Sequence, residues 1–364
     1  MPVNYLNKAM HYDVKSKKLP NSEVEIEVSL PAEELEKGRK TAIKELSENM
    51  ELDGFRKGHV PENVVLERAG EDLLLERAAD VALRNHFQAI IMQEKFDTLG
   101  HPQVSVTKLA LGNPFEFKAK FAVMPEFELP DYKKIAASIK QQASSKKEEV
   151  EASEKEVDDV LLQIRKNKAH IEWHKNNPEA DHHDHPDLEK EESLPELTDE
   201  LAKEAGNFKD VEELKAKIKE NIIEEKKQRE ADKTRAKMME AILKDTTIEL
   251  PEVLVEAEIN KSIAQLKDDV ARMGGSWEDY LSHTKKTEDD LRKDMHNSSA
   301  ERAKIQLIFN KIAIAEKIEP NQEIMEQEVK VIKEHYKDAS EQSARIYVAT
   351  ILINQAVLKL LESQ

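Results

Sequence analysis

A stretch of fourteen residues without one large apolar side chain limits how this chain can fold. It runs from Glu224 to Lys237, inside a longer segment with helical periodicity. A helix that is polar on every side usually bridges solvent and does not join a core. Of the 364 residues, 36% are charged and 5% are aromatic, whereas an average domain has about 25% charged residues. We therefore expect much exposed helix and more than one compact core.

The first third of the chain has the pattern of an α+β domain. Apolar residues alternate with polar ones over 24–30 and again over 115–123, which is typical of strands with one buried face. Helical segments beginning at Pro31 and near Glu71 separate these strands. Residues 1–132 are therefore predicted to form a domain of antiparallel strands with two helices.

The rest of the chain is predicted to be helical, with two polar interruptions. Residues 133–152 are rich in Lys, Ser, Glu and Ala and are predicted to form a solvated, partly extended linker. A first arm helix is expected over 153–175, followed by a polar, histidine-containing linker over 176–193. Residues 194–364 complete the expected fold, an elongated and discontinuous all-α arm domain after the α+β domain.

Several helix starts are marked by capping boxes. In this motif a short polar side chain caps the third helical residue, whose own side chain reaches back to the cap. The pairs that fit are Ser153 with Glu156, Asp210 with Glu213, and Thr287 with Asp290.

Composition excludes several classes of function. The formal net charge is −18, so nucleic-acid contact would require a local basic patch. Cysteine is absent, which excludes disulfides, thiolate metal sites and a cysteine nucleophile. Gly206 is the only glycine between Gly112 and Gly274, which leaves little place for a phosphate-binding loop. No catalytic residue, cofactor or bound metal is expected.

The chain has no sequence feature that indicates a membrane or an export pathway. The N-terminus lacks the apolar segment of a signal peptide, and no run of about 18 apolar residues occurs. We therefore expect a cytoplasmic protein without a membrane partner.

One short segment has the composition of a binding loop. It reads Gly54-Phe55-Arg56-Lys57-Gly58-His59-Val60-Pro61. The two glycines permit positive φ at both ends of a tight loop, and the proline restricts the backbone where the loop ends. Phe55 is then expected to point outward, with Arg56 and Lys57 beside it to contact phosphates or carboxylates. The alternative is that Phe55 folds under the loop and the two cations are only solvated.

This segment resembles the ribosome-binding signature of trigger factor, the bacterial chaperone at the polypeptide tunnel exit. The resemblance covers most of residues 1–140 and 153–364, and further similar segments are Pro125–Leu129, Leu194–Thr198, Ile248–Pro251 and Leu307–Pro320. It implies a ribosome-associated chaperone with unfolded or nascent polypeptides as clients, and a homodimer away from the ribosome. The residues implied to bind the large ribosomal subunit are Gly54, Phe55, Arg56, Lys57, Gly58 and Pro61.

The chain departs from the family in one respect. Trigger factors typically carry a prolyl isomerase domain of roughly a hundred residues before the segment that resembles Leu194–Thr198. Here the interval from Trp173 to Ser193 is short and polar and has no strand pattern. The isomerase domain is therefore expected to be missing, and its activity is not expected.

If the helices leave apolar stripes uncovered, flexible thioethers would suit varied apolar clients. The methionines predicted to bind clients are Met238, Met239, Met273, Met295 and Met325. No nucleotide-binding motif occurs, so client release is expected to be passive and independent of ATP. Trp277 and Tyr280 are expected to pack in a core, with client contact as the alternative.

Two other classes of function stay open at this point. The chain could be a helical scaffold or assembly factor for one dedicated partner, without a role at the ribosome. It could also handle metal through a set of histidines, although their polar surroundings favour a solvated linker. These histidines are His170, His174, His182, His183 and His185.

Overall fold

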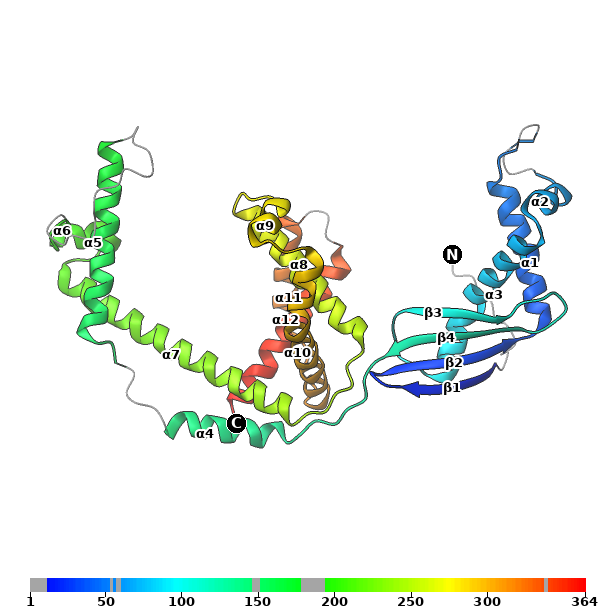
Figure 1. The fold of residues 1–364 in the computed structure, drawn as a ribbon. Coiled ribbons are helices and arrows are strands. Elements are labelled where there is room, and N and C mark those ends of the chain that lie inside the picture. The colour runs from blue at the N-terminus through cyan, green and yellow to red at the C-terminus, as the bar shows by residue number, and fades with distance from the viewer. Residues whose placement is uncertain (1–11, 53–54, 57–59, 146–150, 178–193, 337–339) are drawn as a thin grey trace. The chain divides into compact units, whose positions relative to one another are not determined.

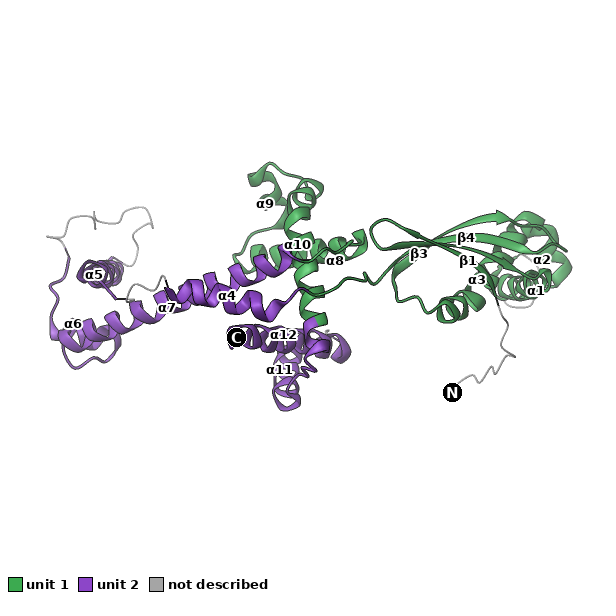
Figure 2. Cartoon of the chain, turned by 90° about the horizontal axis from the view of Figure 1, so that it is seen from below, with its two compact units in different colours: residues 1–129, 246–311 green, residues 130–245, 312–364 purple. Residues whose placement is uncertain are grey.

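The computed structural model describes residues 12–52, 55–56, 60–145, 151–177, 194–336 and 340–364 (Figure 1). The chain divides into two compact units (Figure 2). Unit 1 contains residues 1–129 and 246–311, and unit 2 contains residues 130–245 and 312–364. The helical part expected over 194–364 is thus shared between both units.

Unit 1 contains a four-stranded antiparallel sheet with the order β1-β2-β4-β3. In the pairing of β2 with β4, Val24 lies opposite Phe121 and Ile26 lies opposite Ala119. The apolar side chains of both strands therefore share one face, and α1 and α3 pack against it (Figure 1). The strands are Asp13–Leu19 (β1), Glu23–Leu30 (β2), Thr98–Lys108 (β3) and Phe115–Val123 (β4), and the helices are Ala32–Asn49 (α1), Glu62–Ala69 (α2) and Glu71–Glu94 (α3). The predicted antiparallel α+β domain is confirmed.

A polar network holds the start of β1 against both helices. The hydroxyl of Tyr12 is 3.0 Å from His86 Nδ1, and His86 Nε2 is 2.9 Å from Glu34 Oε2. Lys37 donates to the other oxygen of the same carboxylate over 2.7 Å. Burial alone would raise the pKa of Glu34, but the hydrogen bonds from Lys37 and His86 outweigh it, and the pKa is lowered.

Unit 1 also contains three helices from later in the chain, Glu252–Arg272 (α8), Trp277–Thr284 (α9) and the first part of Glu288–Ala315 (α10). Their core forms where Val255 and Ile259 of α8 meet Leu291 of α10. Trp277 and Tyr280 stack with their ring centroids 5.5 Å apart and pack against this core. Core packing was the expected role of these two residues.

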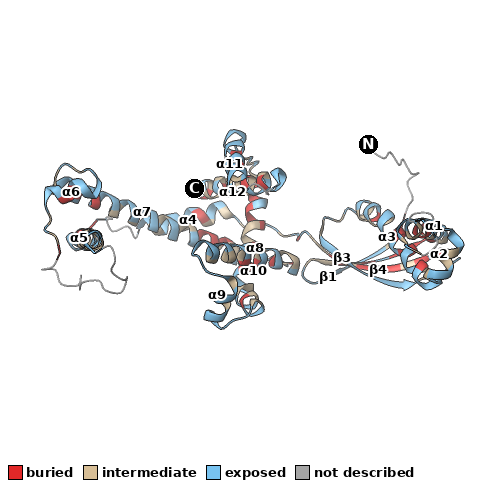
Figure 3. Cartoon of the chain, turned by 90° about the horizontal axis from the view of Figure 1, so that it is seen from above, coloured by how far each residue is buried: buried red, intermediate tan, exposed pale blue. Residues whose placement is uncertain are grey.

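All regular secondary structure among the described residues of unit 2 is helical. Its first core joins Glu154–Asn176 (α5), Asp199–Gly206 (α6) and Val211–Lys244 (α7). The capping box of Ser153 and Glu156 is formed in full. Hydrogen bonds from Lys226 and Ser153 together lower the pKa of Glu156 to about 2. The charged middle of α7 is mostly exposed, as the sequence predicts (Figure 3).

The predicted linker over 133–152 is partly helical. Residues Tyr132–Ser145 form α4, which packs against α7 and against Glu341–Glu362 (α12). The expectation of an extended segment is therefore wrong for these residues. Ala136 is the buried residue of α4, and Tyr132, Ile135 and Ile139 are half-buried, so a narrow apolar side stabilises a helix whose other residues are mostly exposed.

The last two helices, Gln322–His335 (α11) and α12, pair within unit 2. Met325 and Val329 of α11 pack against Ala344 and Val348 of α12. Farther along α12, Val357 and Leu361 are also buried. Because this helix is apolar on more than one side, these contacts leave part of its apolar surface uncovered.

Replacing Glu34 by Gln tests the polar network. A carboxyl with a lowered pKa stabilises the fold above its unfolded pKa, and this contribution is lost as the pH falls through the folded value. We expect Glu34→Gln to lower the free energy of unfolding by about 1–3 kcal/mol at neutral pH, with the difference shrinking below about pH 4.5. Urea unfolding followed by circular dichroism at both pH values measures this. A difference independent of pH would contradict the assignment.

Candidate functional site

The binding loop lies between α1 and α2 and is fixed at both ends. Val60, after the loop, is buried in a small core with Ile43 of α1 and Val65 of α2, and Leu52, before the loop, packs half-buried against the same core. The Ser47 hydroxyl donates to the carbonyl oxygen of Val60 over 2.7 Å. Pro61, which is exposed, then precedes the first residue of α2. The buried stem therefore fixes where the loop leaves and re-enters the domain.

At the tip of this loop an aromatic side chain faces solvent. Phe55 is 41% exposed and belongs to no buried cluster among the described residues. Its backbone N–H donates to the Leu52 carbonyl over 3.1 Å. Arg56 beside it is also exposed. Gly54, Lys57 and Gly58 lie outside the described residues.

A second exposed surface lies on the paired helices α11 and α12 (Figure 3). From Ile346 to Leu358, α12 carries no charged residue. We call the exposed apolar side chains of these two helices the α11–α12 surface. They are Ile324 at 43%, Val331 at 48%, Ile346 at 62%, Tyr347 at 54% and Ile351 at 37%.

The composition of α12 distinguishes it from the other described helices. Among the described helices it alone is long and apolar enough to cross a membrane by length and composition, with a mean hydropathy of 1.4. Arg345 and Lys359 lie at the two ends of its uncharged stretch. One side of the helix packs against α11. A half-covered apolar helix of this kind can bind apolar segments of another chain.

Comparison with protein families gives two matches. The family model described as bacterial trigger factor protein matches residues 12–164, and that of the bacterial trigger factor C-terminus matches residues 210–362. The chain belongs to the trigger factor family. The N-terminal match contains the loop, and the C-terminal match contains the α11–α12 surface.

Curated relatives support this assignment over most of the chain. The trigger factor of Caldanaerobacter subterraneus subsp. tengcongensis is 26% identical, and the alignment covers 88% of this chain and 89% of the relative. The trigger factor of Clostridium kluyveri is 23% identical, with 96% and 98% covered.

A solved structure of the trigger factor chaperone has the same fold. It was reported for promiscuous substrate recognition in folding and assembly activities. The TM-score is 0.54 at 17% identity, with 97% of this chain and 99% of that chain covered. Family and fold together support a chaperone function.

The comparisons also bear on the isomerase domain. Neither matching trigger factor model covers residues 165–209. The alignment to the Clostridium kluyveri protein spans 431 positions, which exceeds the 364 residues of this chain. The relative therefore carries residues without a counterpart here, which supports the absence of an isomerase domain. Most of the polar interval that replaces it lies outside the described residues.

The five methionines predicted to bind clients occupy different environments. Met238, Met239 and Met325 are buried, at 2%, 8% and 8% exposure, so they contribute to cores and form no open surface in this structure. Met295 packs, partly buried, against the core of α8 and α10. Met273, 79% exposed at the end of α8, is the one that faces solvent. Helical spacing alone does not distinguish these environments.

The exposed residues of α12 were not among the predicted sites. A signal for them was present, because apolar residues such as Tyr347 and Ile351 lie on sides of α12 other than its buried Val348. A helix that is apolar on several sides needs several neighbours to bury it. The polar segments around α12 cannot supply them.

Two of the five histidines fall on a described helix. His170 and His174 of α5 have ring centroids 4.6 Å apart, and Trp173 lies 5.1 Å from His174. Among the described residues no group of three metal-ligating side chains occurs. His182, His183 and His185 lie outside the described residues.

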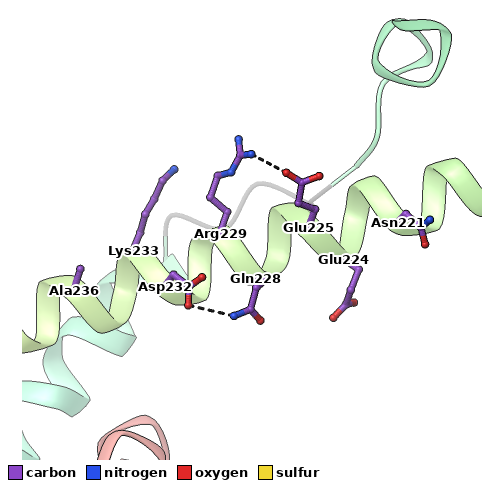
Figure 4. Close-up of a pocket in the computed structure, with 8 residues that line it drawn as sticks. All are labelled: Asn221, Glu224, Glu225, Gln228, Arg229, Asp232, Lys233 and Ala236. Carbon is purple, nitrogen blue, oxygen red and sulfur yellow. Dashed lines mark hydrogen bonds and ion pairs between the residues drawn. The ribbon is translucent and has the colours of Figure 1, made fainter. Parts of the chain in front are cut away.

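A hollow along α7 is lined by residues of that helix alone, seven polar ones and Ala236 (Figure 4). Arg229 pairs with Glu225 over 2.8 Å, and Gln228 donates to Asp232 over 3.2 Å. These groups satisfy one another along a solvated helix. The hollow is formed by one solvated helix with no second element of the described chain facing it, so it does not enclose a ligand.

Met238→Ala and Met273→Ala test the assignment of the methionines. Removing the buried side chain leaves a cavity, so we expect Met238→Ala to lower the free energy of unfolding by about 2–5 kcal/mol. We expect Met273→Ala to change it by less than about 0.5 kcal/mol. Urea unfolding of both variants measures this, and equal small effects would show that Met238 is not in a packed core.

Proposed function

We propose that this chain is an ATP-independent, ribosome-associated chaperone of the bacterial cytoplasm. Its loop docks on the large ribosomal subunit at the tunnel exit, and its exposed apolar helices hold nascent or unfolded polypeptides. It has no enzymatic activity. The observation that carries the docking step is the solvent-exposed Phe55 at the tip of a loop whose stem is buried.

The electrostatics of the domain favour local docking. Residues 1–132 contain 17 Lys and Arg against 23 Asp and Glu, so the domain as a whole is not attracted to ribosomal RNA. Arg56 and Lys57 therefore supply the favourable charge at the contact, and Phe55 supplies the apolar anchor. Binding through so few cations is moderate, reversible and weaker at high salt.

Co-sedimentation with ribosomes tests the docking step. We expect the combined change of Phe55, Arg56 and Lys57 to Ala to weaken ribosome binding by about tenfold or more, because an aromatic anchor and its cations carry most of such an interface.

A matched control removes the same kinds of side chain elsewhere on the domain. Met92, Arg68 and Lys44 are one exposed apolar residue and two exposed cations. Their combined change to Ala should leave sedimentation unchanged. Equal pelleting of the loop variant and the wild type would refute the docking assignment.

The α11–α12 surface is the best supported client site. Its side chains are apolar and exposed, and those on α12 lie within residues 346–351, about 8 Å at helical rise. Such a surface covers several residues of an unfolded segment without selecting a charge. Contacts of this size are individually weak, so clients leave by folding and no nucleotide is needed.

Suppression of aggregation tests this site. We expect Ile346→Lys with Ile351→Lys to reduce the protection of unfolded clients severalfold, because a charge disfavours apolar contact. Asn221→Lys with Gln228→Lys adds the same two charges at exposed positions of α7, outside the α11–α12 surface, and should retain protection. Light scattering of several unrelated unfolded proteins measures the effect. Undiminished protection by the double variant would remove α12 from the client site.

The same experiment separates the proposal from a dedicated scaffold. A scaffold for one partner would protect that partner and no unrelated client. Protection of several unrelated proteins, combined with ribosome binding through Phe55, is the outcome that the chaperone proposal requires.

A further inference from the structure

The two edges of the sheet in unit 1 differ in chemistry. β1 and β3 are the edge strands, each with a single neighbour in the sheet (Figure 1). An edge strand presents unpaired backbone N–H and C=O groups that can pair with another extended chain. Proteins usually block such edges with charged side chains, prolines or bulges.

The β1 edge is blocked along its length. Its seven residues include Lys15, Lys17 and Lys18, besides Asp13. An incoming strand would have to place its side chains beside these charges and remove water from them. This edge therefore disfavours pairing with an apolar segment.

The β3 edge is blocked only at its ends. Pro102 and a register shift between Leu99 and Gln103 interrupt one end, and a second shift precedes Lys108 at the other. Between them, residues 103–107 carry no charge and are all exposed. These limits leave a short open window in an otherwise protected strand.

Side chains in this window continue the core face of the sheet. Val104 pairs with Ala119 and Val106 pairs with Phe117, and both of these partners are buried on the face covered by α1 and α3. Val104 and Val106 nevertheless remain 38% and 47% exposed. Paired residues point to the same side of a sheet, so the apolar face extends uncovered to its edge.

We propose that β3 binds extended apolar segments of client polypeptides by strand addition over residues 103–107. Backbone hydrogen bonds supply affinity independent of sequence, and alternate apolar side chains of the client pack beside Val104 and Val106. The proposal rests on the chaperone function proposed above and adds a second client site, on the N-terminal domain. Because the window is short, binding there is weak and reversible.

The occupant follows from the chemistry of the window. The unpaired backbone groups of β3 can pair only with an extended chain, because the backbone N–H and C=O groups of a helix already bond to one another. The lack of charge and the two exposed valines require a partner segment with apolar residues at alternate positions. Unfolded polypeptides contain such segments in many different sequences. A site that binds through backbone hydrogen bonds can accept all of them.

Hydrogen exchange with a defined peptide tests the proposal on the full chain. The probe is a peptide of about eight alternating Val and Thr residues, which favours the extended state. We expect saturating peptide to slow exchange of the outward-facing amides in residues 103–107 by about tenfold or more. The same peptide N-methylated at successive central residues keeps its side chains but loses its donors, and it should give no protection. Equal protection by both peptides, or none by either, would overturn strand addition.

Variants distinguish this site from the α11–α12 surface. Val104→Lys with Val106→Lys should abolish protection at β3, whereas Ile346→Lys with Ile351→Lys should leave it intact. If aggregation suppression and ribosome binding persist while β3 shows no protection, the strand-addition site is wrong and the chaperone proposal stands. If wild-type chain without peptide forms a dimer that the β3 variant does not form, the occupant is a second copy and the proposal is also overturned.

Discussion

The apolar side chains of this chain are divided among several small cores, and this division determines what the rest of the structure can do. A charged helix such as the middle of α7 cannot enter a core without burying unpaired charges, which is costly. Ile26 and its neighbours therefore pack in the sheet, Leu214 packs near the start of α7, and Val348 packs between α11 and α12. Small cores cannot cover every apolar face, so exposed surfaces such as Ile346 remain.

Patterns that depend on local physics were sufficient to predict much of the fold. The alternation over β2 and β4 predicted the sheet, because each residue pointing inward is apolar. The capping side chains of Ser153, Asp210 and Thr287 all accept hydrogen bonds from the expected backbone N–H groups. The exposure of Phe55 was predicted for a similar reason, since a tight loop tip offers an aromatic ring no core.

Features that depend on tertiary contacts were not predicted. β1 carries three lysines and has little alternation of its own, so its strand is defined by pairing with β2. α4 is a mostly polar sequence in which Ala136 is buried and a few apolar side chains are half-buried. Burial of Met238 and exposure of Met273 depend on which neighbours reach each helix face, and a single sequence does not contain that information. The exposed sides of α12 and the open window of β3 also depend on which neighbours pack against them.

The proposed contacts differ in their dependence on charge, and this difference follows from the acidic composition. A chain of net charge −18 is attracted to RNA only where cations are concentrated, so the proposed ribosome contact at Arg56 and Lys57 is one that salt screens. The uncharged stretches of α12 and β3 bind through apolar area and backbone hydrogen bonds, which salt screens little. Higher ionic strength is therefore expected to release the proposed ribosome contact while the proposed client contacts persist. An acidic chaperone of this design keeps localisation and client binding as physically separate interactions.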